Sequence, residues 1–438
     1  MPSTLISRRN FFGTAGLAGA AALAPPLLAQ KADESLPQLS RPKGTPEVVA
    51  RDESFWQRVA AYYKVSNRFT NLEAGFWGAM ASPVLDQFLQ HTQRVNLENS
   101  FYARRSYDAE VAAARVRVAK ELNVSVDEVA FTRGATEALQ CLIGGYNKLK
   151  PGDAVMYADL DYYSMQYALN WLTERRGARV VRFAIPEPAT RENVIGAYRD
   201  ALRANPNVRL LLLTYINNKT GLILPVAEIA ALARAQGADI ILDAAHAWGQ
   251  TDFKVYDLGV DFIGFNLHKW VGAPVGAGVM FIRAGRLSAI DRMMADESNP
   301  ADSILSRVHS GTANFATFLT VPAALDFHAA IGSSYKAARL RYLRDRWVHA
   351  VRDVPGINIL TPDEEKMVGG ITSFRLKDRK TKEENQRLVE EILTRYGLFT
   401  VWRTGIERGD CVRVTPALYN GPQDVDRLAA ALKQLAAA

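Results

Sequence analysis

Seven short apolar runs between residues 126 and 283 constrain the fold of this chain more than any other feature. They are VAF (129–131), AVMYA (154–158), RVVRF (179–183), RLLLLTYI (209–216), DIILD (239–243), DFIGF (261–265) and GVMFI (278–282). Helical patterns or turns separate them. Strands that are apolar throughout are buried on both faces, which is typical of parallel sheets covered by helices. The sequence therefore predicts an α/β domain with a mainly parallel seven-stranded sheet between helices.

The rest of the chain frames this domain. A chain of 438 residues is too long for one ordinary core. Residues 51–125 have a helical pattern that the loop-like NLEAGFWGAM interrupts, and another long helical stretch runs from about 315 to 352. Strand and helix patterns then alternate to the C-terminus. We expect a large domain over 126–315, followed over 316–438 by a linking helix and a small α+β domain.

The first residues read as a targeting segment. Arg8 and Arg9 precede GTAGLAGAAALAPPLLAQ, which is the layout of a twin-arginine (Tat) signal peptide. An uncleaved membrane anchor is the alternative, but this stretch is short and glycine-rich for a span of about 20 residues. We predict a signal peptide over 1–29 and a linker over 30–50. The expected consequences are export by the Tat machinery, no stable membrane anchoring and a periplasmic location.

Composition excludes several classes of function. The formal net charge of +7 is modest, and no long Lys/Arg block is interleaved with aromatics, so nucleic-acid binding is not expected. Two cysteines, Cys141 and Cys411, are too few for a disulfide framework or a zinc site. No metal site is predicted.

Two polar side chains stand where neighbouring apolar runs end. Lys269 follows one run in FIGFNLHKWVGAPVG, and Asp243 closes another in ADIILD. Ligands of parallel sheets bind beyond the carboxyl ends of the strands. Pyridoxal phosphate requires a lysine for a Schiff base and an acid that keeps its ring nitrogen protonated. The pattern predicts this cofactor with Lys269 as the catalytic residue, and a structural salt bridge of Asp243 is the alternative.

Three further motifs follow strands at the same edge. In RGAT, Ala135 and Thr136 begin a helix whose N-terminus suits a phosphate, although an ordinary helix cap would look alike. In DYYS, Tyr162 is placed to stack on a ring, or to pack on the surface. In NNKTG, Asn218 is placed to donate to the cofactor, or to form a turn. Lys219 lies in that turn and ranks below Lys269.

Taken in order, RGATEAL, DYYS, YINNKTG, DAAHAWGQ, HKWVGAPVGAG, HSGTANF and VRVTPALYN resemble the class V aminotransferase family of fold type I pyridoxal phosphate enzymes. The resemblance covers roughly residues 65 to 435. It implies roles for eight residues around the cofactor. Ala135, Thr136, Asn266 and His268 bind the phosphate, Tyr162 stacks on the ring, Asn218 contacts the phenolic oxygen, Asp243 pairs with the ring nitrogen, and His246 lies beside it.

The same resemblance implies a homodimer and a substrate site. Thr312 resembles the threonine that reaches a phosphate in the partner subunit, and residues 51–125 complete the small domain and the dimer interface. Arg413 resembles the arginine that grips a substrate α-carboxylate, which suits a guanidinium. Arg403 and Asn71 are further candidates for substrate contact.

Differences from the family's sequence pattern reduce the number of activities that we expect for this chain. Desulfurases carry a nucleophilic cysteine on a mobile loop, whereas Cys411 stands two residues before Arg413, on one predicted strand and facing the same way. NLEAGFWGAM and the C-terminal pattern are closest to the isopenicillin N epimerase-like branch. We expect an exported epimerase or aminotransferase that acts on the amino group of an amino acid or peptide-like substrate.

That reaction would pass through a Lys269 aldimine and a quinonoid, and tailoring of a secreted peptide metabolite such as a siderophore would explain the export. A C–S lyase or cysteine desulfurase-like activity is one alternative. A catalytically inactive binding protein on the same fold is the other, and the intact Lys269, Asp243 and His268 argue against it.

Overall fold

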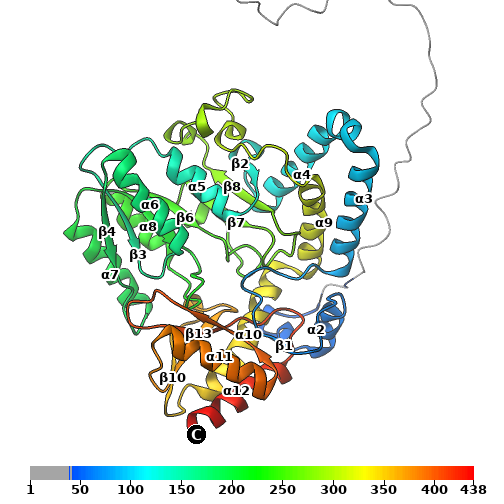
Figure 1. Cartoon of the computed structure of the whole chain (residues 1–438), viewed down its shortest axis with the longest axis vertical. Coiled ribbons are helices and arrows are strands. Elements are labelled where there is room, and N and C mark those ends of the chain that lie inside the picture. Colours follow the sequence, from blue (N-terminus) through cyan, green and yellow to red (C-terminus); the bar gives the residue numbers. More distant parts are fainter. Residues whose placement is uncertain (1–38, 40–41) are drawn as a thin grey trace, which may run out of the picture. The chain divides into compact units, whose positions relative to one another are not determined.

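The computed structural model describes Leu39 and residues 42–438 (Figure 1). The predicted signal peptide at 1–29 lies outside these residues, as does most of the predicted linker at 30–50. The described end of that linker is part of the fold. Helix α1 (Pro46–Val49) is capped by the Thr45 side chain, and Val49 and Ala50 are buried.

All seven predicted strands form, and they join into one sheet. They are β2 (Val129–Thr132), β3 (Ala154–Ala158), β4 (Arg179–Phe183), β5 (Val208–Thr214), β6 (Asp239–Asp243), β7 (Phe262–Asn266) and β8 (Gly278–Ile282). Their order in the sheet is β2-β8-β7-β6-β5-β3-β4. Strand β8 runs antiparallel to both neighbours, and the other adjacent pairs are parallel. The predicted fold class is confirmed.

Both faces of the sheet are buried along its central strands, as the continuous apolar runs predicted, whereas the edge strand β4 is partly exposed. Leu211 and Leu213 of β5 pack in one hydrophobic cluster, and the alternating Leu210 and Leu212 pack in another. The second cluster includes residues of α5 (Ala135–Gly145) and α6 (Tyr163–Arg176). The first includes residues of α7 (Arg191–Ala204) and α8 (Val226–Ala235). A sheet covered on both faces leaves its strand ends as the place for a site.

The predicted helical stretch at 315–352 is two helices. Helix α9 (Phe315–Ile331) and α10 (Ser333–Val351) meet at an angle of 72°. Gly332 lies between them with φ of +94°, a conformation that L side chains rarely adopt. In Figure 1, α9 runs beside α3 (Ser82–Arg105) and α4 (Tyr107–Leu122).

Within the described part of the chain, α9 and α10 pass a test of length and apolar composition for a membrane span only as this bent pair, and no single helix passes it.

The C-terminal region is a small α+β domain, as predicted. Its four-stranded antiparallel sheet has the order β12-β13-β10-β9, with helices packed against it. The strands are β9 (Ile357–Ile359), β10 (Thr372–Leu376), β12 (Val401–Arg403) and β13 (Cys411–Val414), and the helices are α11 (Lys382–Tyr396) and α12 (Pro422–Ala437). Strand β1 (Thr70–Asn71) pairs in parallel with β11 (Leu398–Phe399), so the N-terminal segment joins this domain.

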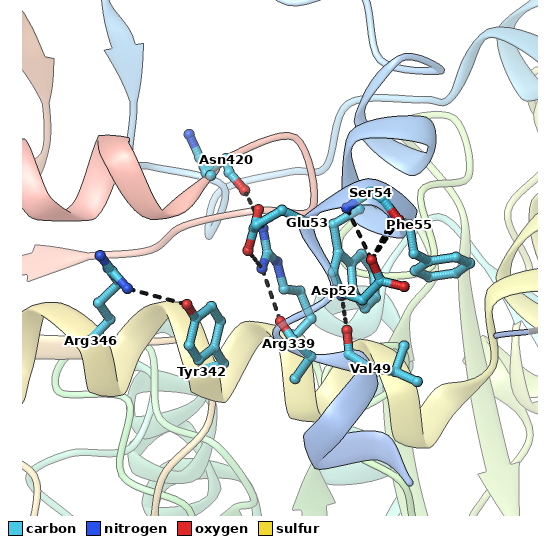
Figure 2. A network of polar contacts seen from close by, with 12 residues as sticks. Val49, Asp52, Glu53, Ser54, Phe55, Arg339, Tyr342, Arg346 and Asn420 are labelled. Atoms are coloured by element: carbon cyan, nitrogen blue, oxygen red, sulfur yellow. Dashed lines mark hydrogen bonds and ion pairs between the residues drawn. The ribbon is translucent and has the colours of Figure 1, made fainter. Parts of the chain in front are cut away.

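One buried arginine ties the N-terminal helices to α10. Figure 2 shows Arg339 reaching from α10 to Glu53, the first residue of α2 (Glu53–Ala60). The two guanidinium ends donate to the two carboxylate oxygens at 2.5 and 2.9 Å, and one also donates to the Ala50 carbonyl at 2.9 Å. The guanidinium lies 5.4 Å from the ring centroids of both Trp56 and Tyr342. This bidentate pair holds α2 in place.

Candidate active site

The central predicted residues meet at the carboxyl edge of the sheet. Asp243 is the last residue of β6, and Lys269 follows the adjacent strand β7 by three residues. His246, three residues after Asp243, lies with its Nε2 2.9 Å from Lys269 Nζ. The sheet register therefore brings the acid and the lysine into one site, as the strand pattern predicted.

The hydrogen bonds of His246 determine its tautomer. Trp270 donates its indole N–H to His246 Nδ1 at 3.2 Å, so the ring proton lies on Nε2. Nε2 then donates to Lys269 Nζ, which accepts through the lone pair of a neutral amine. Burial lowers the pKa of His246 well below its usual range, so the ring stays uncharged. The contact thus holds a neutral, nucleophilic Lys269.

Burial acts in opposite directions on the two charged groups of the site. It lowers the pKa of Lys269 to about 7, and the nearby charge of Arg413 acts in the same direction. Burial raises the pKa of Asp243, whereas the Ala245 N–H, which donates to its Oδ1 at 2.9 Å, and the charge of Lys269 act against the rise. A buried carboxylate next to a lysine suits a cationic partner such as a protonated pyridine nitrogen.

The predicted phosphate residues gather at the start of α5. The Ala135 N–H donates to Asn266 Oδ1 at 2.7 Å, and His268 Nδ1 lies 3.0 Å from the Ala277 carbonyl. A Cβ on Gly134 would lie 3.1 Å from Asn266 Oδ1 and 3.3 Å from His268 Cε1, so glycine leaves room there. Thr136 is exposed in the first turn, where a helix has free amide hydrogens for an anion.

The NNKTG motif forms the turn that was one of the two structures predicted for it. Asn217 forms the turn, because its Oδ1 accepts from the Lys219 N–H at 3.1 Å and from the Thr220 N–H at 2.7 Å. Asn218 Oδ1 is buried and has no hydrogen-bond partner among the described residues. Tyr162 is the N-cap residue of α6 and half-buried. Asn218 is therefore free to bind a ligand.

These groups fit pyridoxal phosphate. A helix N-terminus with room beside Gly134 suits the phosphate, Asp243 suits the ring nitrogen, and Asn218, whose side-chain N–H₂ is a donor, suits the phenolic oxygen. The neutral Lys269 amine suits the aldehyde carbon.

The predicted arginines share an acid that sequence analysis missed. Glu73 Oε1 accepts a hydrogen bond from Arg413 Nη2 and another from Arg403 Nη2 at 3.3 Å. Arg413 Nη1 donates to the Asn218 carbonyl at 2.7 Å. Glu73 lies in NLEAGFWGAM. It is the only acid in this apolar, glycine-rich loop, and that feature could have marked it as a site residue in the sequence.

The same loop covers the lysine and the arginine. The Gly78 N–H donates to the His268 carbonyl at 2.8 Å. A Cβ on Gly78 would lie 1.9 Å from the Lys269 carbonyl oxygen, and one on Gly75 would lie 2.6 Å from Arg413 Nη2. Both glycines are needed for the loop to approach this closely.

Two predicted site residues lie outside this cluster. Asn71 donates to the Tyr419 hydroxyl at 3.0 Å and accepts from the Glu73 N–H at 2.9 Å, and it lines a separate cavity of about 300 Å³. It therefore positions Glu73. Thr312 is exposed, although Ser310, two residues earlier, donates to Glu137 in the first turn of α5 at 3.1 Å.

The other lysines near the site are tied to main-chain oxygens. Lys219 Nζ donates to the carbonyl of Asp159 and, at 2.8 Å, to that of Gly405. These contacts agree with the expectation that Lys219 is a poorer candidate than Lys269 for the Schiff base. Sequence analysis missed Lys336, whose Nζ donates to the Trp270 carbonyl at 2.7 Å. Burial lowers the pKa of Lys336 to about 7. Its position on a long helix gave no sign of this contact.

Comparison with known proteins agrees with the geometry. The model of the family described as aminotransferase class-V matches residues 82–428. Isopenicillin N epimerase from Streptomyces clavuligerus is 26% identical, covering 87% of this chain and 98% of its own length. A cysteine desulfurase from Klebsiella pneumoniae is 27% identical, covering 75% and 82%.

Solved structures share the fold. The cysteine desulfurase CsdA from Escherichia coli superposes with a TM-score of 0.73 at 21% identity, covering 87% of this chain and 98% of that one. Because the family match spans most of the sequence, this chain belongs to the class V aminotransferase family of pyridoxal phosphate-dependent enzymes.

Proposed function

We propose that this enzyme is exported and acts on the amino group of an amino acid or peptide-like substrate, as an epimerase or an aminotransferase. The contact between Lys269 and the neutral His246 carries the proposal, because it holds an uncharged amine beside the buried Asp243. The likeness to isopenicillin N epimerases over nearly their whole length supports this class of reaction.

The residues divide the chemistry between them. The bound cofactor supplies an electron-poor ring that makes the substrate Cα–H acidic. Lys269 Nζ, when free, takes the Cα proton, and His246 orients it through the 2.9 Å contact. Asp243 holds a proton at the ring nitrogen. The arginines near Glu73 orient an acidic group of the substrate, and the loop with Gly75 and Gly78 excludes water from the lysine.

A specific observation weighs against the cysteine desulfurase alternative. Cys411 lies in β13, and its Sγ is buried 3.7 Å from the Lys219 carbonyl oxygen. Burial raises the pKa of this thiol to about 11, so little thiolate is present at neutral pH. A buried thiol on a rigid strand cannot deliver sulfur as a mobile loop does. Sulfide release from cysteine that is lost in Cys411→Ala would favour the alternative.

Reductive trapping tests the proposed lysine. Borohydride treatment of the holoenzyme is expected to leave a cofactor adduct on the peptide that carries Lys269, detected by mass spectrometry. Lys219→Met is the matched control and should keep that adduct. An adduct on Lys219, or none, would refute the assignment. Chiral chromatography and 2-oxo acid assays with single amino acids and short peptides then separate epimerisation from transamination.

Export and dimerisation are parts of the same proposal. The Arg8-Arg9 pair supports Tat export to the periplasm, which fractionation of cells expressing Arg8→Lys/Arg9→Lys would test, since that variant should stay in the cytoplasm. The exposed Thr312 beside the α5 N-terminus supports a homodimer in which this residue reaches the partner's phosphate site. A monomer in light scattering would contradict it.

A further inference from the structure

The residues around Glu73 form a cluster that the proposed reaction does not fully explain. We call Glu73, Arg403 and Arg413 the Glu73 cluster. One carboxylate oxygen of Glu73 accepts from both guanidinium groups. Arg413 is 1% exposed and Glu73 is 9% exposed, so this ion pair is almost completely removed from water.

Several buried polar atoms of the cluster have no partner. They are Glu73 Oε2, Arg403 Nε and Arg413 Nε, and the neighbouring Asn218 Oδ1 is also unpartnered among the described residues. Buried polar groups in proteins are nearly always hydrogen-bonded. The two unpartnered Nε–H donors, one from each arginine, indicate a place for an anionic ligand group, whereas the two unpartnered oxygens are acceptors and suit a donor group of the same ligand.

The charges of the cluster do not cancel. Two guanidinium groups face one carboxylate, which leaves one positive charge. Arg413 is held at both ends, by Glu73 and by the Asn218 carbonyl. Arg403 has weaker contacts, 3.3 Å to Glu73 and 3.4 Å to the Trp402 carbonyl, and its side chain is 26% exposed. The uncompensated charge therefore lies at Arg403.

We propose that Glu73 determines substrate specificity by acting as an internal carboxylate, so that the arginine pair accepts one substrate carboxylate and disfavours a second. This inference rests on the proposed function and adds the substrate class, a monocarboxylic amino acid or peptide-like molecule. Arg403 receives that carboxylate, and Arg413 positions Glu73. A dicarboxylic substrate would leave one buried negative charge without a partner, which is unfavourable.

Propionate and succinate test how many carboxylates the arginine pair accepts. They correspond to alanine and aspartate without the amino group, so they cannot react with the cofactor at Lys269. Their binding to the holoenzyme is measured by calorimetry. We expect the wild type to prefer propionate by about tenfold or more, because an unpaired like charge in a buried site is strongly disfavoured. Glu73→Gln should reduce that preference to about threefold or less by freeing one guanidinium.

Two control variants separate charge from structure. Glu73→Asp keeps the negative charge and should keep the preference for propionate. Glu53→Gln removes the acid that pairs with the buried Arg339, outside the Glu73 cluster, and should lower the melting temperature without changing the preference. If Glu73→Gln fails to fold, Arg403→Gln still tests the proposal, since propionate binding should then fall by about tenfold with the loss of the free charge.

The inference is overturned if Glu73→Gln folds and keeps the wild-type ratio, if Glu73→Asp loses the preference as Glu73→Gln does, or if Arg403→Gln binds propionate unchanged. These outcomes are independent of the Lys269 adduct. A missing adduct refutes the proposed function, whereas an unchanged ratio refutes only the role of Glu73.

Discussion

Two buried arginines of this chain, Arg339 and Arg413, pair with glutamates in different ways. Arg339 and Glu53 form a bidentate pair in which each carboxylate oxygen has its own guanidinium nitrogen, and two aromatic rings flank it (Figure 2). In the Glu73 cluster, one oxygen serves two arginines and the other has no partner. Only Nε of Arg339 is unpartnered in the first pair.

The difference separates structure from function. A network in which both carboxylate oxygens are paired stabilises a packing arrangement, whereas one that leaves a carboxylate oxygen unpaired keeps hydrogen-bonding capacity that a ligand can complete. The Arg339 pair joins α2 to α10. The Glu73 cluster lies beside Lys269, where the cofactor and substrate meet. Substitutions in the two networks should therefore affect different measurements.

The largest effect on turnover is expected for Lys269→Ala. Loss of the amine removes both the covalent anchor and the proton acceptor, so turnover should fall by about a thousandfold or more. The melting temperature of the apoprotein should not fall, because a buried amine is removed. Activity assays and thermal melts of the same preparation compare the turnover and the melting temperature of the variant with those of the wild type. A folded variant with near-normal turnover would refute the site.

Arg339→Met should have the largest effect on stability. It removes the charged hydrogen bonds to Glu53 and to the Ala50 carbonyl, and because the Glu53 side chain is 35% exposed and stays solvated, the loss should be about 1.5–3 kcal/mol. Denaturant unfolding measures the loss, while turnover per folded molecule should stay close to wild type. If turnover fell without any loss of stability, the contrast between the two networks would be wrong.

Gly78→Ala should lower both the stability of the protein and the amount of bound cofactor. Its Cβ would lie 1.9 Å from the Lys269 carbonyl oxygen, and overpacking of this kind costs about 1–3 kcal/mol. Because the displaced atom belongs to Lys269, bound cofactor should also decrease, as visible absorbance would show. Gly196→Ala in α7 is the control. No atom lies within 4 Å of its added Cβ, so this helix should become slightly more stable.

The smallest effect should be a pH dependence of cofactor uptake. Lys269 has a pKa lowered to about 7 from 10.5, so the reactive neutral amine predominates above pH 7. Uptake by the apoprotein should fall about tenfold per pH unit below that value and level off above it. Stopped-flow absorbance measures the rate. A rate that still rises steeply at pH 9 would mean that His246 does not hold a neutral amine.

Much of the fold was predictable because buried strands appear in the sequence as short apolar runs. The seven apolar runs became the seven strands within two residues at each end, and Asp243 and Lys269 met because adjacent parallel strands end at one edge. The bend at Gly332 was missed, since the residues on both sides of it have a helical pattern that predicts one continuous stretch. Strand β9 was also missed, because it is only three residues long.

By itself, the sequence determined the sheet, the edge at which Asp243 and Lys269 meet and the class of cofactor, because each follows from residues close together in the chain. Only the tertiary structure decided which groups surround that lysine. Glu73 and Arg413 are 340 positions apart, and the Lys336 contact to Trp270 spans 66. Such contacts depend on how separate elements pack, and charge and burial then set the protonation and pairing of each group.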